Sequence, residues 1–301
     1  MNTTTKAIIA VIVTNILFAA NYSIAKLVTP ALMKPLALNV VRVIVTVTLF
    51  WLLYALQPEK TSFKKKHIIR LIICAITGVA INQILFIKGL SLTTSIHASL
   101  LSLGTPIFIT VIAAFLLKEP LTLQKIIGLL IGISGGAVLI SMKENVSAGS
   151  NIAFGDFLVV INAISYAFYF VLVKPLMEEY KLLTILRWLF TIGAIIIVPL
   201  GWNEFIEIKW AAFSLANWLE TAFVAIGATF VGYLLNVYGI QHLGSSKTGA
   251  YIYTQPVFAA IIAIVFLKEE FNWQKGLASA LIIIAVYLVN KKPKPIQTIT
   301  E

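Results

Sequence analysis

The feature that most constrains this chain is a series of apolar runs between residues 7 and 291. Each run is about 20 residues long, the length an α-helix needs to cross roughly 30 Å of hydrocarbon. The connections between the runs are short, and none could hold a soluble domain. A segment in lipid must satisfy its own backbone hydrogen bonds, so these runs predict transmembrane helices.

The runs predict an all-α integral membrane protein with ten transmembrane helices. We place them at residues 7–28, 36–56, 68–88, 94–117, 122–142, 154–175, 182–201, 217–239, 245–267 and 273–291. Ten spans leave both termini on one side of the membrane. Fourteen Lys and Arg flank that side and seven flank the other, which predicts that both termini are cytoplasmic.

Composition excludes two other classes of protein. Hydrophobic residues make up 59% of the chain and charged residues only 12%, whereas a soluble domain carries roughly 25% charged residues. The net charge of +11 does not indicate nucleic-acid binding, because the basic residues lie between apolar runs rather than on one module. Cys74 lies inside an apolar run without a partner, so we expect no disulfide.

A stretch that begins at Gly89 is written a second time at Gly239. The landmarks keep a constant offset of 150 positions: Pro106 matches Pro256, Lys118-Glu119 matches Lys268-Glu269, and Gln124-Lys125 matches Gln274-Lys275. Chance similarity of apolar segments does not explain shared proline, glycine and charged positions at one offset. The chain therefore contains an internal repeat.

The repeat predicts two units of opposite orientation, because five helices per unit is an odd number. Inverted repeats around a central cavity are a recurring plan for alternating-access transporters, with the substrate near the membrane midplane. The expected division is a first repeat at 1–142, a connecting loop at 143–153, a second repeat at 154–291 and a cytoplasmic tail at 292–301.

Several segments resemble the EamA-type, ten-helix members of the drug/metabolite transporter superfamily. They are "FAANYSIAK", "PLALNVVR", "FLLKEPLTLQKIIG" and "VFLKEEFNWQKG", with glycines 132, 135 and 136 late in the fifth span. The tenth span departs from the pattern, with Ala278 and Ala285 in that region. The resemblance implies a bacterial-type inner-membrane transporter of small metabolites such as amino acids, with a preference for export.

Polar residues inside membrane helices are costly unless they face protein, water or substrate. Asn162, Tyr166 and Tyr169 share one face of the sixth span, and Asn21 corresponds to Tyr169 in the first. The remaining uncharged candidates for lining a cavity are Asn82, Gln83, Thr105, Asn236, Tyr251, Tyr253 and Gln255. The alternative for each is a hydrogen bond that holds two helices together.

Two arginines and two prolines complete the candidate residues. Arg42 and Arg187 lie at nearly equivalent positions of the second and seventh spans, about 10 Å deep at 1.5 Å per residue. Each either reaches back to the interface or binds an anionic group of a substrate. Pro106 and Pro256 are expected to bend the fourth and ninth spans and to act as hinges.

The positions of the acidic residues limit the mechanism. The single Asp, Asp156, and all the Glu lie at span ends or in loops. No carboxylate lies in the middle of a span, which disfavours proton coupling through a buried acid. No catalytic motif, metal-ligand cluster or cofactor motif is present, so we expect no enzyme, metal or cofactor. The expected partners are a small-molecule substrate and the bilayer. A channel-like protein, a non-transporting scaffold and a homo-oligomer stay open as alternatives.

Overall fold

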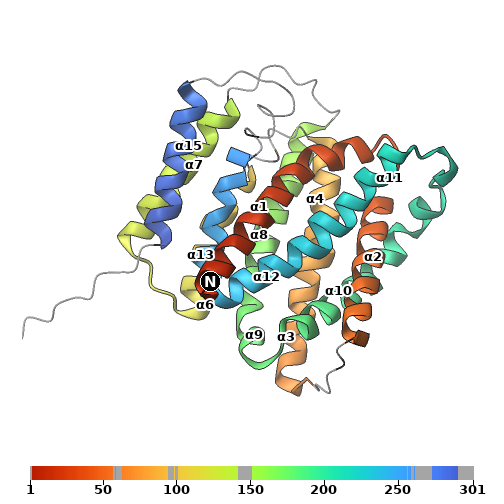
Figure 1. Ribbon diagram of the computed structural model, residues 1–301, viewed down its shortest axis with the longest axis horizontal. Helices are drawn as coiled ribbons and strands as arrows, with labels where there is room; N and C mark the ends of the chain where they lie inside the picture. Colours follow the sequence, from red (N-terminus) through yellow and green to blue (C-terminus); the bar gives the residue numbers. More distant parts are fainter. Residues whose placement is uncertain are drawn as a thin grey trace, which may run out of the picture.

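The computed structural model describes residues 2–56, 58, 63–93, 98, 101–141, 151–255, 257, 258, 261 and 273–290. These residues form helices joined by short connections (Figure 1), and none of them lies in a β-strand. The prediction of an all-helical protein is therefore confirmed over this part of the chain.

The helices follow the predicted apolar runs closely. In the first half they are α1 (Thr3–Val28), α2 (Pro35–Leu56), α3 (Lys65–Ala75), η1 (Ile76–Ala80), α4 (Ile81–Leu92), α6 (Thr105–Leu117) and α7 (Leu123–Ser141). In the second half they are α8 (Ile152–Leu172), α9 (Lys174–Glu179), α10 (Leu182–Ile206), η2 (Trp210–Ala212), α11 (Leu215–Ala222), η3 (Phe223–Val231), α12 (Gly232–Leu243), α13 (Ser245–Ala250), η4 (Tyr251–Tyr253) and α15 (Trp273–Asn290).

Six helical stretches within the described ranges are long and apolar enough to cross a membrane. They are Thr3–Val28, Pro35–Leu56, Lys65–Leu92, Ile152–Glu179, Leu182–Ile206 and Leu215–Leu243. Three further apolar helices are shorter: Thr105–Leu117, Leu123–Gly135 and Ala280–Val289. The predicted spans at 94–117 and 245–267 include residues outside the described ranges, so the count of ten stays a prediction.

Large apolar side chains cover the outside of the helix bundle. Phe115 is 79% exposed and Leu56 is 78% exposed, whereas Asn39, Thr46 and Thr229 are completely buried. A water-soluble protein shows the opposite distribution, because exposed apolar patches of this extent favour association. The surface therefore fits a lipid environment.

The first helix of each half begins with the same cap. The side chain of Asn2 accepts a hydrogen bond from the backbone N–H of Thr5 (2.8 Å), and that of Asn151 accepts one from Phe154 N–H (3.3 Å). Each asparagine thereby satisfies a backbone donor that has no partner within the helix. The caps lie 149 positions apart, close to the offset of the repeat.

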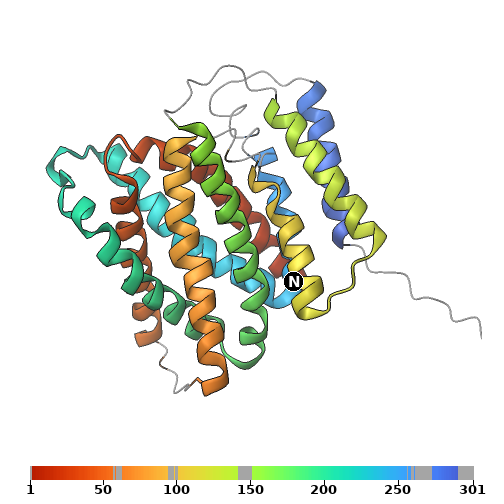
Figure 2. The ribbon, with the colours of Figure 1, turned by 180° about the vertical axis from the view of Figure 1, so that it is seen from behind.

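The helices pack in pairs that join the two halves. Helix α1 packs along α12, α4 along α8, and α2 along α10. Helices α7 and α15 form a further pair at one side of the bundle, as Figures 1 and 2 both show. The core of the molecule thus lies between helices of different halves.

Two glycines at matching positions of the repeat lie at close contacts within these pairs. A Cβ on Gly89 of α4 would lie 2.9 Å from the Val159 side chain of α8, and a Cβ on Gly239 of α12 would lie 2.2 Å from the Val11 side chain of α1. Small residues let membrane helices approach closely and gain packing energy. The two contacts involve matching positions of the repeat, at offsets of 150 and 148.

The third and eighth predicted spans each contain a π-helical segment, η1 and η3. A π-helical turn leaves backbone groups free for other partners, and such turns are frequent at functional sites. In η1 the Thr77 carbonyl accepts a hydrogen bond from Ser165 (2.7 Å), and the Gly78 carbonyl accepts one from the Tyr233 hydroxyl (2.6 Å). Both donors come from the second half, so the irregular turn joins the halves.

Candidate functional site

A cavity of about 90 Å³ lies where helices of both halves meet. Helices α1, α2, α4 and α6 supply its walls from the first half, and α8, η3, α12 and η4 from the second. Its lining consists of Phe18, Asn21, Tyr22, Arg42, Asn82, Phe86, Ser102, Thr105, Asn162, Tyr166, Ala228, Tyr233, Ile252 and Gln255. Aromatic surface with a few converging polar groups is typical of a small-molecule site.

Seven of the residues singled out from the sequence line this cavity. They are Asn21, Arg42, Asn82, Thr105, Asn162, Tyr166 and Gln255. They come from six of the predicted spans, and the polar faces of the first and sixth spans meet there. The other half of the lining, with Tyr22, Phe86 and Tyr233 among it, was not in that set.

Hydrogen bonds across the two halves fix the polar wall of the cavity. Asn162 donates to the Asn82 carbonyl (2.7 Å), and the Tyr233 hydroxyl lies 3.1 Å from the Asn82 side-chain oxygen. Within the first half, the Tyr22 hydroxyl donates to Ser102 (2.9 Å), and both residues line the cavity. Buried polar groups that are paired in this way hold their positions, because breaking one bond leaves a desolvated group without a partner.

Arg42 is the charged residue of the cavity, and it is only 5% exposed. Its Nε donates to the Thr229 hydroxyl (2.9 Å), which itself donates to the Val224 carbonyl of η3 (2.7 Å). Its Nη1 has no hydrogen-bond partner among the described residues. No Asp or Glu occurs among the described residues of the lining, so the cavity itself supplies no counter-ion.

Asn21, which also lines the cavity, has a second buried polar atom without a partner. The residue is 4% exposed, and its Oδ1 accepts no hydrogen bond from any described residue. The ring of Tyr22 meets that of Phe86 edge to face, with centroids 5.4 Å apart. The residues that line the cavity therefore include one with an unsatisfied donor, one with an unsatisfied acceptor and several aromatic rings.

Arg187 is buried outside the cavity lining. Its guanidinium carbon lies 3.6 Å from the centroid of the Tyr54 ring, 4.7 Å from that of Trp51 and 5.7 Å from that of Trp188. Cation–π contacts of this kind stabilise a cation without a carboxylate. Arg187 thus belongs to an aromatic cluster between α2 and α10.

Five further predicted residues also lie outside the lining, in packing positions. A Cβ on Gly78 would lie 2.3 Å from the ring of Tyr169, and a Cβ on Gly132 would lie 2.5 Å from the ring of Tyr253. The Tyr253 hydroxyl donates to the Leu129 carbonyl (3.1 Å). Asn236 Nδ2 donates to the hydroxyl of Tyr166, which does line the cavity. The remaining two are Gln83 and Tyr251, which are both buried.

The predicted hinge at Pro106 has a different setting from the one expected. The described residues before it end in a turn at Leu103 and Gly104, and α6 begins at Thr105, so Pro106 lies in the first turn of a helix. A proline there removes no intrahelical hydrogen bond, because the first N–H groups have no partner in any case. Pro256 lies outside the described residues.

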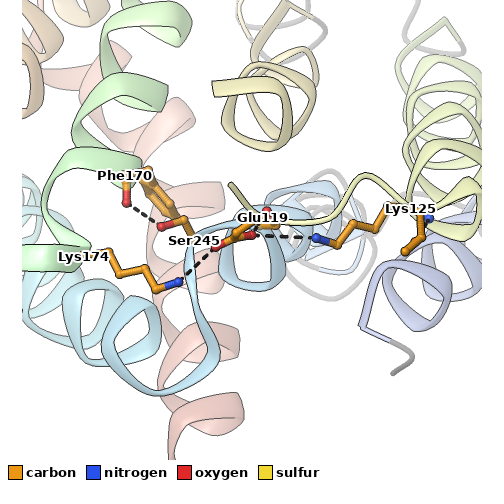
Figure 3. Close-up of polar contacts among 7 residues, drawn as sticks. Glu119, Lys125, Phe170, Lys174 and Ser245 are labelled. Atoms are coloured by element: carbon orange, nitrogen blue, oxygen red, sulfur yellow. Dashed lines mark hydrogen bonds and ion pairs between the residues drawn. The ribbon is translucent and has the colours of Figure 1, made fainter. Parts of the chain in front are cut away.

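A cluster of charges joins the two halves away from the cavity (Figure 3). Glu119, in the connection after α6, accepts hydrogen bonds from Lys174 of α9 (3.1 Å) and Ser246 of α13 (2.5 Å), and Lys125 lies 3.8 Å away. Burial raises the pKa of the Glu119 carboxyl, but these hydrogen bonds and lysine charges outweigh it and hold the pKa below its usual value. Glu119 is therefore ionised at neutral pH.

Fold and cavity together define a multi-pass helical membrane protein with a small polar and aromatic site inside. The chain belongs to the EamA-like transporter family, which matches residues 5–142 and again residues 153–291. It is a membrane transporter and not an enzyme. Among the described residues no group of three or more His, Cys, Asp or Glu could hold a metal ion.

Individual relatives are distant in sequence. The chain is 24% identical to the uncharacterized transporter YetK of Bacillus subtilis over 84% of this chain and 77% of the relative. It is 26% identical to a probable terminal-alkyne amino-acid exporter of Streptantibioticus cattleyicolor over 73% and 72%. A crystal structure 16% identical in sequence matches 95% of both chains with a TM-score of 0.74, which shows the fold.

Proposed function

We propose that this transporter moves a small polar metabolite by alternating access at the central cavity. The observation that carries the proposal is the cavity itself, which takes polar side chains from both halves and has aromatic walls. Its volume of about 90 Å³ fits a solute of a few heavy atoms, or a slightly larger solute if the cavity expands modestly. Sites for drug-sized compounds measure roughly 300–1,000 Å³, so the cavity is too small for a compound of that size.

The proposed mechanism needs two halves in opposite orientation. Support comes from features that recur at the repeat offset: the caps at Asn2 and Asn151, the π-helical segments η1 and η3, and the glycine contacts of Gly89 and Gly239. The cross-half pairs α1–α12 and α8–α4 are also each other's counterparts. Rocking such halves around a fixed site exposes it to each side in turn.

The Glu119 cluster supplies a closing contact for this mechanism. It ties the end of α6 in the first half to α9 and α13 in the second. Opening the cavity toward that side requires these elements to separate, which breaks the hydrogen bonds to Lys174 and Ser246. Under the repeat, Lys268-Glu269 would be the counterpart on the other side, and those residues lie outside the described ranges.

Substrate class and direction are further parts of the proposal. An amino acid or a related compound is favoured by the relative named as an amino-acid exporter, and export is the preferred direction. We place the protein in a bacterial-type inner membrane with both termini cytoplasmic, following the distribution of Lys and Arg. Facilitated exchange or uniport is preferred, because no carboxylate lies in the described cavity lining.

Transport in proteoliposomes tests the proposal. The purified protein should give saturable uptake and counterflow for at least one solute of a metabolite panel, and Asn162→Ala with Tyr166→Phe should reduce it. A linear, unsaturated flux without counterflow would indicate a channel, and no flux for any solute would indicate a scaffold. Labelling of cysteines placed at Lys66, Lys294, Lys34 and Lys209 tests the orientation, since the first two should react from the side opposite to the last two.

A further inference from the structure

A chain of hydrogen bonds joins the two halves where α8 begins. Lys26 Nζ, near the end of α1, donates to the Thr93 carbonyl (2.9 Å), and the Thr93 hydroxyl donates to Oδ1 of Asp156 in α8 (2.5 Å). The Thr93 backbone N–H donates to the Gly89 carbonyl (2.9 Å), so all three polar groups of this buried threonine are bonded. Thr93 belongs to the first half and Asp156 to the second, so these bonds hold the halves together at this point.

This contact and the charged cluster of Figure 3 lie toward opposite ends of one helical stretch, Ile152–Glu179. Asp156 lies near its start and Lys174 near its end, 18 positions apart (174 − 156), which is about 27 Å at 1.5 Å per residue. Asn162 and Tyr166, which line the cavity, lie between them. The cavity therefore has a contact between the halves on either side of it.

The repeat relates the two contacts through their lysines. Lys26 and Lys174 occupy matching positions of the first and sixth predicted spans, at an offset of 148. Each lies against the end of a matching helix: Lys26 donates to Thr93, the C-cap of α4, and a Cβ on Gly244, the C-cap of α12, would lie 3.9 Å from Lys174 Nζ. A helix end favours a cation, because its last carbonyls have no partner in the helix. The repeat thus places one lysine at a helix end on each side of the cavity.

The backbones of α4 and α8 approach closely at the Thr93 contact. A Cβ on Gly155 would lie 2.8 Å from the Thr93 backbone nitrogen and 3.0 Å from the Gly89 carbonyl oxygen. Both are backbone atoms, which cannot turn aside as the end of a flexible side chain can. The space between the helices is too small for one methyl group, so a solute cannot pass there unless the helices separate.

We propose that the hydrogen bonds joining Lys26, Thr93 and Asp156 close the cavity toward this end and break when it opens there. The inference rests on the proposed alternating-access function, to which it adds the residues of a second closing contact. This contact and that of Glu119 are both made in this structure. The structure therefore corresponds to the occluded state that lies between the two open states, and each open state breaks one of the two contacts.

Labelling of a single cysteine in the cavity tests each end separately. Ala228 lines the cavity, and Ala228→Cys combined with Cys74→Ala, which removes the one cysteine of the chain, provides the thiol. A membrane-impermeant maleimide is applied to right-side-out and to inverted membrane vesicles. Cysteines at Lys34, in the connection after α1 at the Thr93 end, and at Lys66, at the start of α3 at the other end, identify the two faces.

The bond from Thr93 to the carboxylate should control labelling from one face only. Thr93→Val removes it and should raise the labelling rate about 10-fold from the Lys34 face, the factor for one hydrogen bond to an ionised group, since the rate follows the open fraction. Thr93→Ser keeps the hydroxyl and should label at the unaltered rate. Glu119→Gln should raise the rate about 2-fold from the Lys66 face instead, because that ion pair is partly exposed.

Two further variants make the test specific. Thr110→Val is the matched control, since this buried hydroxyl of α6 has no hydrogen-bond partner among the described residues, and it should leave both rates unchanged. Gly155→Ala adds a methyl group that pushes the backbone of α4 away, and it should raise the rate from the Lys34 face even where Thr93→Val does not fold. Elution as a single species on size exclusion shows that a variant is folded.

The outcomes separate this inference from the function on which it rests. Unaltered labelling of folded Thr93→Val from the Lys34 face, a rise from the Lys66 face, or an equal rise in Thr110→Val would overturn the closing contact while saturable counterflow kept the transporter intact. Rapid labelling of the unaltered protein from both faces, or no saturable counterflow for any solute, would overturn the proposed transport function itself.

Discussion

Two buried arginines at nearly equivalent positions of the repeat have opposite surroundings. Arg42 of α2 ends in the cavity with one neutral hydroxyl as partner, whereas Arg187 of α10 is covered by aromatic rings. The helices that carry them pack against each other. A doubled chain can therefore keep the same residue twice in different surroundings, in the lining of a cavity in one half and in the packing of aromatic rings in the other.

The largest effect expected from this contrast is on stability. Arg187→Ala should lower the free energy of unfolding by about 3 kcal/mol, because it removes the cation–π contacts and leaves a void between packed rings. Arg42→Ala should change it by less than about 1 kcal/mol, because it enlarges an existing cavity and removes an uncompensated charge. Denaturation of the two purified variants measures both values. Equal losses would show that Arg42 is held as firmly as Arg187.

The variant Arg42→Lys distinguishes the effect of the charge of Arg42 from the effect of its planar shape. Arg42→Lys keeps a cation in the cavity but loses the planar guanidinium, so we expect about 10-fold weaker binding of the transported solute. Competition counterflow measures the binding to both proteins. Unchanged binding would mean that the solute does not contact this side chain.

A pair of threonines sharpens the comparison further. Thr229 accepts from Arg42 Nε, and Thr191 accepts from Trp51 Nε1 (3.0 Å) in the aromatic cluster around Arg187. Thr229→Val should weaken amino-acid binding about 5-fold, since a net hydrogen bond contributes about 1 kcal/mol. Thr191→Val should lower stability by a similar free energy without changing binding. The same phenotype from both variants would contradict distinct roles for the two arginines.

Most of the helical framework could be predicted from the sequence, because it depends on local properties. Apolar runs place the helices within a few residues, and the duplicated landmarks identify positions that behave alike, such as Gly89 and Gly239. The π-helical segments could not be predicted, since nothing in either apolar run marks an extra residue per turn. The same limit applies to the setting of Pro106, which depends on the turn before it.

Membership of the cavity was harder to predict, because it depends on distant neighbours. One face of α8 carries Asn162, Tyr166 and Tyr169, but only the first two line the cavity. The ring of Tyr169 packs against Gly78 of η1 instead, because the glycine leaves room for it. The ring of Tyr253 packs against Gly132 of α7 in the same way and does not line the cavity. Periodicity finds the face of a helix, but the partner helix decides which residues of that face line the cavity.

The smallest expected effect concerns a charge for which the protein supplies every partner, in contrast to Arg42. Glu119 has a pKa held below its usual value, so it contributes stability at neutral pH that is lost as the pH falls below about 4.5. Lys174, Lys125 and Ser246 surround its carboxylate, and the side chains of Glu119 and the two lysines are partly exposed. Glu119→Gln should therefore lower the free energy of unfolding by only about 0.5 kcal/mol at pH 7. The difference in melting temperature between Glu119→Gln and the unaltered protein should shrink toward pH 4. A difference that stays constant from pH 7 to pH 4 would show that the carboxylate charge contributes nothing to the contact between the halves.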